Sequence, residues 1–270
     1  MSDKKNIQVC FTADQFSKYS DGKSTVIVID LLRATSVIST AFMEGVKAII
    51  PVQTLDEALE YKEKEGYIVA AERNAKPIEG FDYGNSPFHY INADVEGKTL
   101  VLTTTNGTKA IYNAKEHKVL TASYINIDAV ANHLIDESND VILLCSGWKG
   151  VFNLEDPIFA GSLAKLLLES GRYDSNCDSL FASMQLLKSA EGNLFNYLSD
   201  SSHRKRLKSL NMEDDTRFCL SPTVKSDIIP ILKDGKLVVL EDEKEIYNSC
   251  FTFIFKFNLI CDYSLGFLCS

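Results

Sequence analysis

Short apolar runs alternate with segments of helical pattern through roughly the first 170 residues of the chain. The run 25–29 is built of β-branched residues, a composition typical of a strand that is covered on both faces. From Ser36 the apolar side chains recur at helical spacing instead, as Val37, Ala41 and Phe42 do. This alternation predicts an α/β fold in which a largely parallel or mixed sheet, or more than one sheet, is flanked by helices in layers.

The same patterns predict where the other elements lie. We expect further strands at 47–52, 67–71, 99–103, 118–122, 140–145, 217–220, 227–232 and 236–240. We expect further helices at 54–66, from about 108, from about 126, and at 156–170, 178–190 and 193–210. Residues 72–87 lack periodicity and predict a long ordered loop, which in compact domains is often functional.

The α/β pattern extends over residues 1–240, either as one region or as two α/β subdomains, 1–125 and 126–240. Residues 241–270 do not match what precedes them, because phenylalanines alternate there with polar and aliphatic residues. This tail is consistent with an edge strand or with a poorly specified extension, and we assign it no function.

The composition excludes some classes of partner. The formal net charge is −9, from 37 acidic and 28 basic residues, whereas a nucleic-acid-binding protein needs a basic face. No apolar stretch approaches the roughly 18 residues of a membrane span, and residues 1–5 do not open a secretory leader. The seven cysteines are scattered and lack metal-binding spacing. We therefore expect a cytoplasmic protein that binds neither nucleic acid nor membrane; whether it forms a homo-oligomer is not readable from the sequence.

Three polar strings each follow a run that predicts a buried strand, at 30–35, 103–108 and 153–156. In an open α/β sheet, ligands bind at the carboxyl ends of the strands. Carboxylates, an arginine, hydroxyl groups and a glycine gathered there would suit a phosphate group held by magnesium. We therefore predict that the three turns meet in one cleft around a divalent ion.

Asp30 follows a buried strand and admits two interpretations. Its carboxylate can coordinate a hard cation or attack phosphorus, or it can cap the helix that follows. Arg33 and Thr35 lie in the same turn. Caps seldom need an arginine, so the functional interpretation is favoured.

The turn Thr104, Thr105, Asn106, Gly107 and Thr108 has the same arrangement of strand, polar turn and helix. Asn-Gly alone is a common turn. The threonine hydroxyls could also hold phosphate oxygens or the water ligands of a metal. A phosphate cradle and an ordinary turn both remain open.

Two acidic residues, Glu155 and Asp156, stand at the start of the predicted helix 156–170. Asp156 stands directly before Pro157, a position that N-capping explains completely. Asp156 is therefore either a helix cap or a metal ligand. Glu155 has no such explanation and is the better candidate for a metal ligand or base. The basic cluster 203–206 predicts a solvated helix face, with an anion-recruiting rim as the alternative.

Taken in order, these strings resemble the motifs of the 2-phosphosulfolactate phosphatase (ComB) family. The matching strings are 28–36, 84–87, 97–108, 153–156, 160–161, 201–203, 215–219 and 228–232. The resemblance implies an unusual α/β fold. It also implies a magnesium-dependent phosphatase that hydrolyses (R)-2-phospho-3-sulfolactate to 3-sulfolactate and phosphate, a step in coenzyme M biosynthesis.

We predict that Asp30, Arg33 and Glu155 act in catalysis and that Asp30, Glu155 and Asp156 bind Mg²⁺. The predicted contacts to the small anionic phosphoester are Thr35, Asn85, Ser86, Thr104, Thr105, Asn106, Gly107 and Thr108. The nucleophile is either Asp30 or a metal-activated water. Two other functions stay open: a phosphatase for another phosphorylated hydroxy acid, and a noncatalytic anion-binding module.

Overall fold

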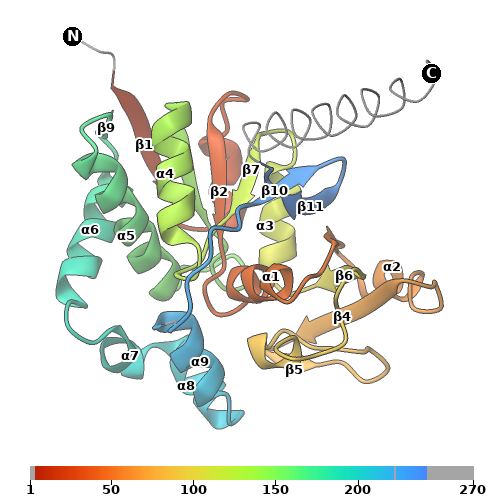
Figure 1. The fold of residues 1–270 in the computed structure, drawn as a ribbon. Helices are drawn as coiled ribbons and strands as arrows, with labels where there is room; N and C mark the ends of the chain where they lie inside the picture. Colours follow the sequence, from red (N-terminus) through yellow and green to blue (C-terminus); the bar gives the residue numbers. More distant parts are fainter. Residues whose placement is uncertain (1–3, 222, 242–270) are drawn as a thin grey trace, which may run out of the picture. The chain divides into compact units, whose positions relative to one another are not determined.

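An 11-stranded mixed sheet forms the centre of the fold (Figure 1). The structure is a computed structural model that describes residues 4–221 and 223–241. The strands are β1 (Lys5–Cys10), β2 (Thr25–Ile29), β3 (Ala48–Pro51), β4 (Tyr67–Arg73), β5 (Lys76–Pro77), β6 (Thr99–Thr103), β7 (Val119–Thr121), β8 (Val141–Cys145), β9 (Tyr173–Asp174), β10 (Pro230–Lys233) and β11 (Lys236–Val239). Their order across the sheet is β5-β4-β6-β3-β11-β10-β7-β2-β8-β1-β9.

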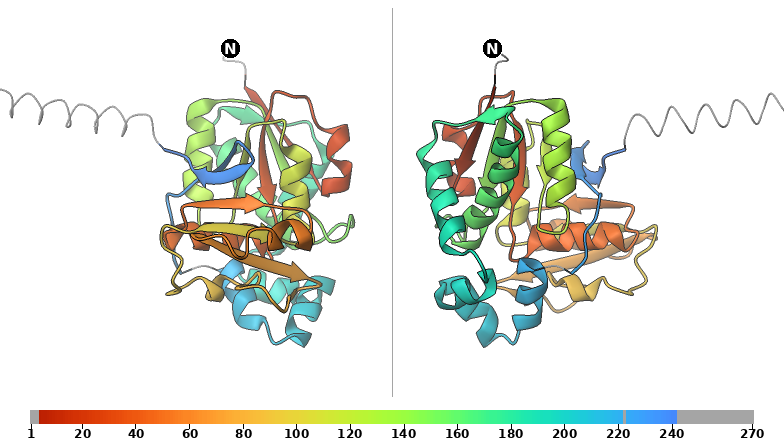
Figure 2. Two further views of the ribbon diagram at one scale, coloured as in Figure 1. Left: turned by 90° about the vertical axis from the view of Figure 1, so that its right-hand side faces the viewer. Right: turned by 60° about the vertical axis from the view of Figure 1, so that its left-hand side comes forward.

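Two groups of parallel strands make up most of this sheet. One group is β4-β6-β3, and the other is β7-β2-β8-β1-β9. The antiparallel hairpin of β10 and β11 joins them, pairing Ile231 with Leu120 and Leu237 with Ile49. Figure 2 shows that the two groups run crosswise to each other. The prediction of an α/β fold with a largely parallel or mixed sheet is confirmed.

Helices cover the sheet. They are α1 (Ala34–Met43), α2 (Leu55–Leu59), α3 (Gly107–Ala114), α4 (Ile127–Glu137), α5 (Glu155–Glu169), α6 (Asp178–Ser189), α7 (Leu194–Tyr197), α8 (Ser202–Ser209) and α9 (Glu213–Leu220), with 3₁₀ turns η1 (Ala13–Lys18), η2 (Pro87–His89) and η3 (Leu198–Asp200). Around the larger strand group, α4, α5 and α6 lie on one face and α3 with η1 on the other (Figure 2). Every residue of β2 and β8 is buried, as such two-sided covering requires.

Several predicted elements have different limits or a different type. Residues 217–220, predicted as a strand, form the end of α9, because the buried residues of this segment recur at helical spacing and its first turn carries three acidic residues that favour a helix N-terminus. The predicted helix 193–210 is divided into α7, η3 and α8. The break lies at Ser201, which is extended and whose hydroxyl accepts a hydrogen bond from the backbone N–H of Arg204 at 3.2 Å.

Smaller differences concern helix limits. The α1 helix begins at Ala34 rather than Ser36, and α2 ends at Leu59, well before Gly66. The start of α2 is as predicted, since the Thr54 hydroxyl accepts a hydrogen bond from the backbone N–H of Glu57 at 3.1 Å.

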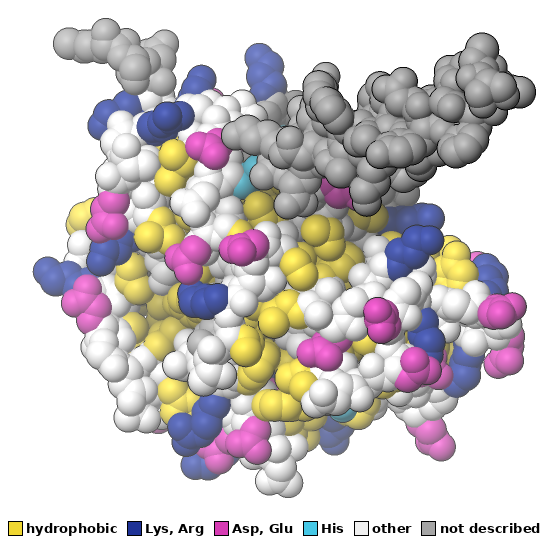
Figure 3. All heavy atoms as spheres, viewed as in Figure 1, with side chains coloured by type: hydrophobic (Ala, Val, Ile, Leu, Met, Phe, Trp, Pro, Cys, Tyr) yellow, Lys and Arg dark blue, Asp and Glu magenta, His cyan; other side chains and the backbone are white. Residues whose placement is uncertain are grey.

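All these elements belong to one compact unit, Met1–Val239, and Leu240–Ser270 form a second unit. Beyond Glu241, the predicted atypical tail lies outside the described residues. The alternative of two subdomains within 1–240 stays a prediction. No helix in the described part of the chain is both long and apolar enough to cross a membrane. On the face drawn in Figure 3, acidic and basic side chains are mixed.

Candidate active site

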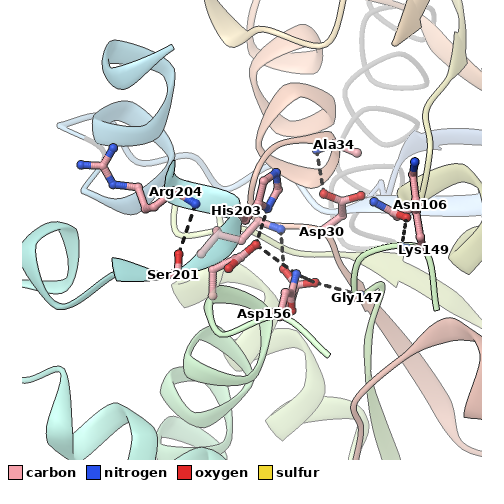
Figure 4. Close-up of polar contacts among 12 residues, drawn as sticks. Asp30, Ala34, Asn106, Gly147, Lys149, Asp156, Ser201, His203 and Arg204 are labelled. Atoms are coloured by element: carbon pink, nitrogen blue, oxygen red, sulfur yellow. Dashed lines mark hydrogen bonds and ion pairs between the residues drawn. The ribbon is translucent and has the colours of Figure 1, made fainter. Parts of the chain in front are cut away.

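The turns that follow β2, β6 and β8 meet at one place. Gly107, after β6, lies so close to Asp30 that a β-carbon added to it would stand 2.9 Å from Oδ2 of Asp30. Asp156, after β8, accepts a hydrogen bond from the backbone N–H of Leu31 at 2.9 Å. Figure 4 shows Asp30, Asn106 and Asp156 gathered from these separate turns. The predicted meeting of the three turns is confirmed.

A small polar recess opens at this meeting point. Its lining residues are Asp30, Leu32, Arg33, Glu72, Ala75, Asn85, Asn106, Trp148 and His203. Arg33 and Asn106 are also the N-caps of α1 and α3, so the N-termini of both helices lie beside the recess. Because the backbone N–H groups and the dipole of a helix N-terminus attract negative charge, the recess suits an anionic ligand.

The turn after β2 presents Asp30 to the recess and keeps Thr35 beneath it. Oδ1 of Asp30 accepts a hydrogen bond from the backbone N–H of Ala34 at 3.3 Å. The Thr35 hydroxyl accepts one from the backbone N–H of Asp30 at 3.2 Å, and Thr35 is fully buried. Thr35, predicted to contact phosphate, therefore lies where it stabilises the turn.

The turn after β6 is stabilised in the same way by Thr104 and Thr108. Each hydroxyl accepts a hydrogen bond from the other residue's backbone N–H, at 3.2 and 3.3 Å. Both side chains are buried. A methyl group at Gly107 would also stand 2.6 Å from the β-carbon of Ala34, so the approach of α3 to α1 depends on the glycine.

Thr105 and Asn106 have different partners. The Thr105 hydroxyl donates to the Glu72 carboxylate, at 3.1 Å from Oε2, and the backbone N–H of Ala75 donates to Oε1 of Glu72. Oδ1 of Asn106 accepts a hydrogen bond from the backbone N–H of Lys149 at 2.9 Å. Thr105 thus connects the turn after β6 to the end of β4, while Asn106 lines the recess directly.

Arg33 is anchored by two partners that sequence analysis did not assign to it. One guanidinium nitrogen donates to Oδ2 of Asp215 in α9, and the other donates to the backbone carbonyl of Ala75 at 2.9 Å. The Ser86 hydroxyl donates to the second oxygen of Asp215 at 2.9 Å, which places Ser86 behind this ion pair. Asn85 lines the recess, and its buried Oδ1 has no hydrogen-bond partner within the described residues.

Asp156 is not the N-cap of α5; the cap is Leu154, and Asp156 is the second residue of the helix. Its carboxylate instead accepts hydrogen bonds from neighbouring turns: Oδ1 from Leu31, and Oδ2 from the backbone N–H of Gly147 at 3.3 Å and from Asn153 at 2.8 Å. Asp156 is therefore a buried connector between the turns after β2 and β8.

His203 is the site residue that sequence analysis missed as an individual side chain. It lines the recess, and its Nδ1 lies 2.5 Å from Oε1 of Glu155, which is fully buried. The predicted solvated helix face at 203–206 is wrong for His203 and Arg204, since both are buried. The string 201–203 of the family resemblance could have identified His203 as a site residue. A basic cluster alone does not indicate which face of the helix is buried.

The crowding of carboxylates changes their protonation. Burial, together with the charges of Glu72 and Glu155, raises the pKa of Asp30 from 3.8 to about 6, although His203 acts in the opposite direction. Burial and the charges of Glu155 and Asp30 raise the pKa of Asp156 well above its ordinary range. The negative charges of Asp30 and Asp156 are thus costly, so these carboxylates favour a nearby cation or a proton.

Cys145, at the end of β8, is fully buried, and burial raises the pKa of its thiol well above the ordinary value. A nucleophilic cysteine needs an accessible thiolate. Cys145 is therefore a core residue.

Known proteins match this chain over most of its length. The family model described as 2-phosphosulpholactate phosphatase matches residues 10–235. A relative from Thermotoga maritima, named "Probable 2-phosphosulfolactate phosphatase", is 40% identical over 217 residues, which are 80% of this chain and 92% of the relative. Relatives of the same name from Caldanaerobacter subterraneus subsp. tengcongensis and Clostridium beijerinckii are 38% identical over 224 residues (82% of this chain, 92% of the relative) and 36% identical over 235 residues (86% and 98%).

This α/β protein, whose strand ends surround an anion-attracting recess and whose residues 10–235 match a phosphatase family model, is a phosphoric monoester hydrolase. The chain belongs to the 2-phosphosulfolactate phosphatase family, as the resemblance predicted.

Proposed function

We propose that this protein is a Mg²⁺-dependent phosphatase that hydrolyses (R)-2-phospho-3-sulfolactate to 3-sulfolactate and phosphate, within coenzyme M biosynthesis. The observation that carries the proposal is the recess itself, where Asp30 and His203 lie beside two helix N-termini in a chain of this family. The substrate is taken from the names of the relatives.

The carboxylates of the site differ in how many partners they have. Asp156, Glu72 and Asp215 each use both oxygens in hydrogen bonds or ion pairs. Within the described residues, Oε2 of Glu155 is buried without a partner, and Oδ2 of Asp30 has no hydrogen bond. Asp30 and Glu155 are therefore the carboxylates that suit a cation.

No group of three or more His, Cys, Asp or Glu side chains is arranged as a metal cluster within the described residues. Magnesium does not require one, because it commonly binds to one or two carboxylates and fills its remaining positions with water and substrate phosphate. Asp30 and Glu155 would hold the ion. When bound, it would neutralise charge on the phosphoryl oxygens and lower the pKa of a coordinated water.

The protein's own groups would bind the phosphoryl group and move a proton. The backbone N–H groups at the starts of α1 and α3 and the side chain of Asn106 would orient the phosphoryl oxygens, where negative charge collects in the transition state. Nδ1 of His203 is held by Glu155, so Nε2 is the nitrogen left to donate a proton to the departing alkoxide oxygen.

The test is phosphate release from a panel of phosphomonoesters by the purified protein. We expect (R)-2-phospho-3-sulfolactate to give the highest kcat/KM, EDTA to abolish turnover, and Mg²⁺ to restore it. Asp30→Asn serves as the inactive control. Turnover that survives EDTA contradicts the metal, a better substrate contradicts the assigned ester, and no release from any ester indicates a noncatalytic module.

A further inference from the structure

Arg206 lies on the same helix as His203 and contacts Trp148, one of the residues that line the recess. In α8 these residues are three positions apart and so lie on one face. Both contact Trp148, a lining residue: the ring centroid of His203 is 5.5 Å from that of Trp148, and the guanidinium carbon of Arg206 is 3.5 Å from it. Nζ of Lys149 lies 5.4 Å from the same ring.

Two hydrogen-bond donors of Arg206 have no partner within the described residues. These donors are the Nε and Nη2 atoms, which are both buried. These two nitrogens form one edge of the planar guanidinium, and their N–H groups run parallel, so the edge can hold two oxygens of one anion. Stacking on Trp148 fixes the plane of the group and hence the direction of this edge.

Arg33, which lines the recess, and Arg73, which follows the lining residue Glu72 in the chain, already have hydrogen-bond partners. Arg33 donates to Asp215 and to Ala75, and Arg73 donates to the backbone carbonyls of Glu72 and Gln53 and to the Thr103 hydroxyl. Burial lowers the pKa of Arg206, and the negative charges of Glu155 and Glu72 oppose this shift. A buried guanidinium edge without a partner is costly, so a ligand anion is the expected occupant.

We propose that Arg206 binds a second anionic group, a sulfonate or carboxylate, of the molecule whose phosphoryl group occupies the recess. The inference rests on the proposed function and deepens it, because it makes Arg206 the residue that distinguishes acidic phosphoesters from simple ones. The phosphoryl group itself is placed at Asn106 and the two helix N-termini, whereas Arg206 adjoins the recess through its contact with Trp148.

Three substrates with the same secondary leaving oxygen test this role: 2-phospho-3-sulfolactate, 2-phospholactate, which lacks the sulfonate, and isopropyl phosphate, which lacks both acids. Arg206→Met should lower kcat/KM for 2-phospho-3-sulfolactate by about 100-fold, mainly through KM, the scale of losing one buried bidentate charge partner. Arg206→Lys should recover only part of this loss, because an ammonium group lacks the fork. For isopropyl phosphate the change should stay below about threefold.

The response of 2-phospholactate assigns the group. A loss equal to that of the full substrate indicates the carboxylate, and a much smaller loss indicates the sulfonate. Equal losses on all three substrates, or no loss on any, overturn the proposal. Lys205→Met is the matched control, since Lys205 is an exposed cation of the same helix that pairs with Asp200, and all its rates should stay within about twofold of wild type.

Calorimetric binding of 3-sulfolactate separates this inference from the proposed function. The wild type should bind this phosphate-free product, and Arg206→Met should bind it at least about tenfold more weakly, whether or not any ester is hydrolysed. Equal binding by both proteins, or none by the wild type, overturns the role of Arg206.

Discussion

Nδ1 of His203 lies 2.5 Å from Oε1 of Glu155, and both side chains are almost completely buried. The hydrogen bond fixes the ring orientation and leaves Nε2 free to face the recess. Glu155 is therefore a positioning residue for His203 as well as the carboxylate with an open oxygen.

If His203 donates a proton to the leaving group, replacing His203 should lower kcat most for esters whose leaving group is a strong base. We expect His203→Asn to lower kcat for alkyl phosphates by about 10² to 10³. For p-nitrophenyl phosphate, whose phenolate leaves unaided, the loss should be under about tenfold. Steady-state kinetics on both esters check this, and equal losses on the two would argue against proton donation.

Neutralising Asp30 should stabilise the protein while abolishing activity. Because its folded-state pKa of about 6 exceeds the ordinary 3.8, the folded state holds this proton more tightly than the unfolded state does. The free energy of unfolding therefore falls as pH rises from about 4 to about 6 and stays lower above that, by about 3 kcal/mol. In EDTA, the free energy of unfolding of Asp30→Asn should exceed that of the wild type by about 2 to 3 kcal/mol at pH 7.5, but by under about 1 kcal/mol at pH 4.

Urea unfolding at the two pH values measures this difference. A gain that is the same at both, or a loss at pH 7.5, would show that Asp30 is not held in a site that disfavours its charge.

The buried ion pair between Arg33 and Asp215 allows structure and catalysis to be separated. Arg33→Ala leaves Asp215 without its cation and should cost about 3 to 5 kcal/mol of stability. Adding Asp215→Ala removes the uncompensated charge and should recover much of that loss. Both variants should still show kcat/KM reduced by about 10² to 10³ if Arg33 contacts the phosphoryl group. Activity that returns with stability would make Arg33 purely structural.

Gly107→Ala should damage both stability and activity. The added β-carbon would stand 2.6 Å from that of Ala34 and 2.9 Å from Oδ2 of Asp30, so α3 must move away from α1. We expect a cost of about 1 to 3 kcal/mol and at least about a 100-fold loss of kcat, because the turn that carries Asn106 moves too. Gly22→Ala is the control: φ there is +72° with open space around it, so it should lose about 1 kcal/mol and no activity. Wild-type kcat in Gly107→Ala would contradict the close approach.

The elements that were predicted well depend on local pattern. The strand at Thr25–Ile29 and the cap at Thr54 can be read from adjacent residues, because burial on both faces and capping leave marks within a few positions. The strand predicted at 217–220 failed because three consecutive apolar residues, 218–220, cannot distinguish a strand from one turn of a buried helix.

Roles within the site depended on partners far away in the chain. Asp156 looked like a helix cap, yet its oxygens bind the amides of Leu31 and Gly147. The hydroxyls of Thr35 and Thr104 looked available to a ligand, yet each is used within its own turn. Neither outcome changes the local sequence pattern, so neither could be predicted from it.

The amino-acid sequence by itself determined the α/β class, the position of the polar turns at strand ends and, through its motifs, the family. Periodicity and turn chemistry act between near neighbours, so they are written in consecutive residues. Only the tertiary structure decided that His203 pairs with Glu155, that Arg33 is held by Asp215, and that Arg206 keeps an open edge. Those relationships form where residues far apart in the sequence pack together in the fold. Contacts of this kind do not alter the pattern of neighbouring residues, so the sequence pattern cannot predict them.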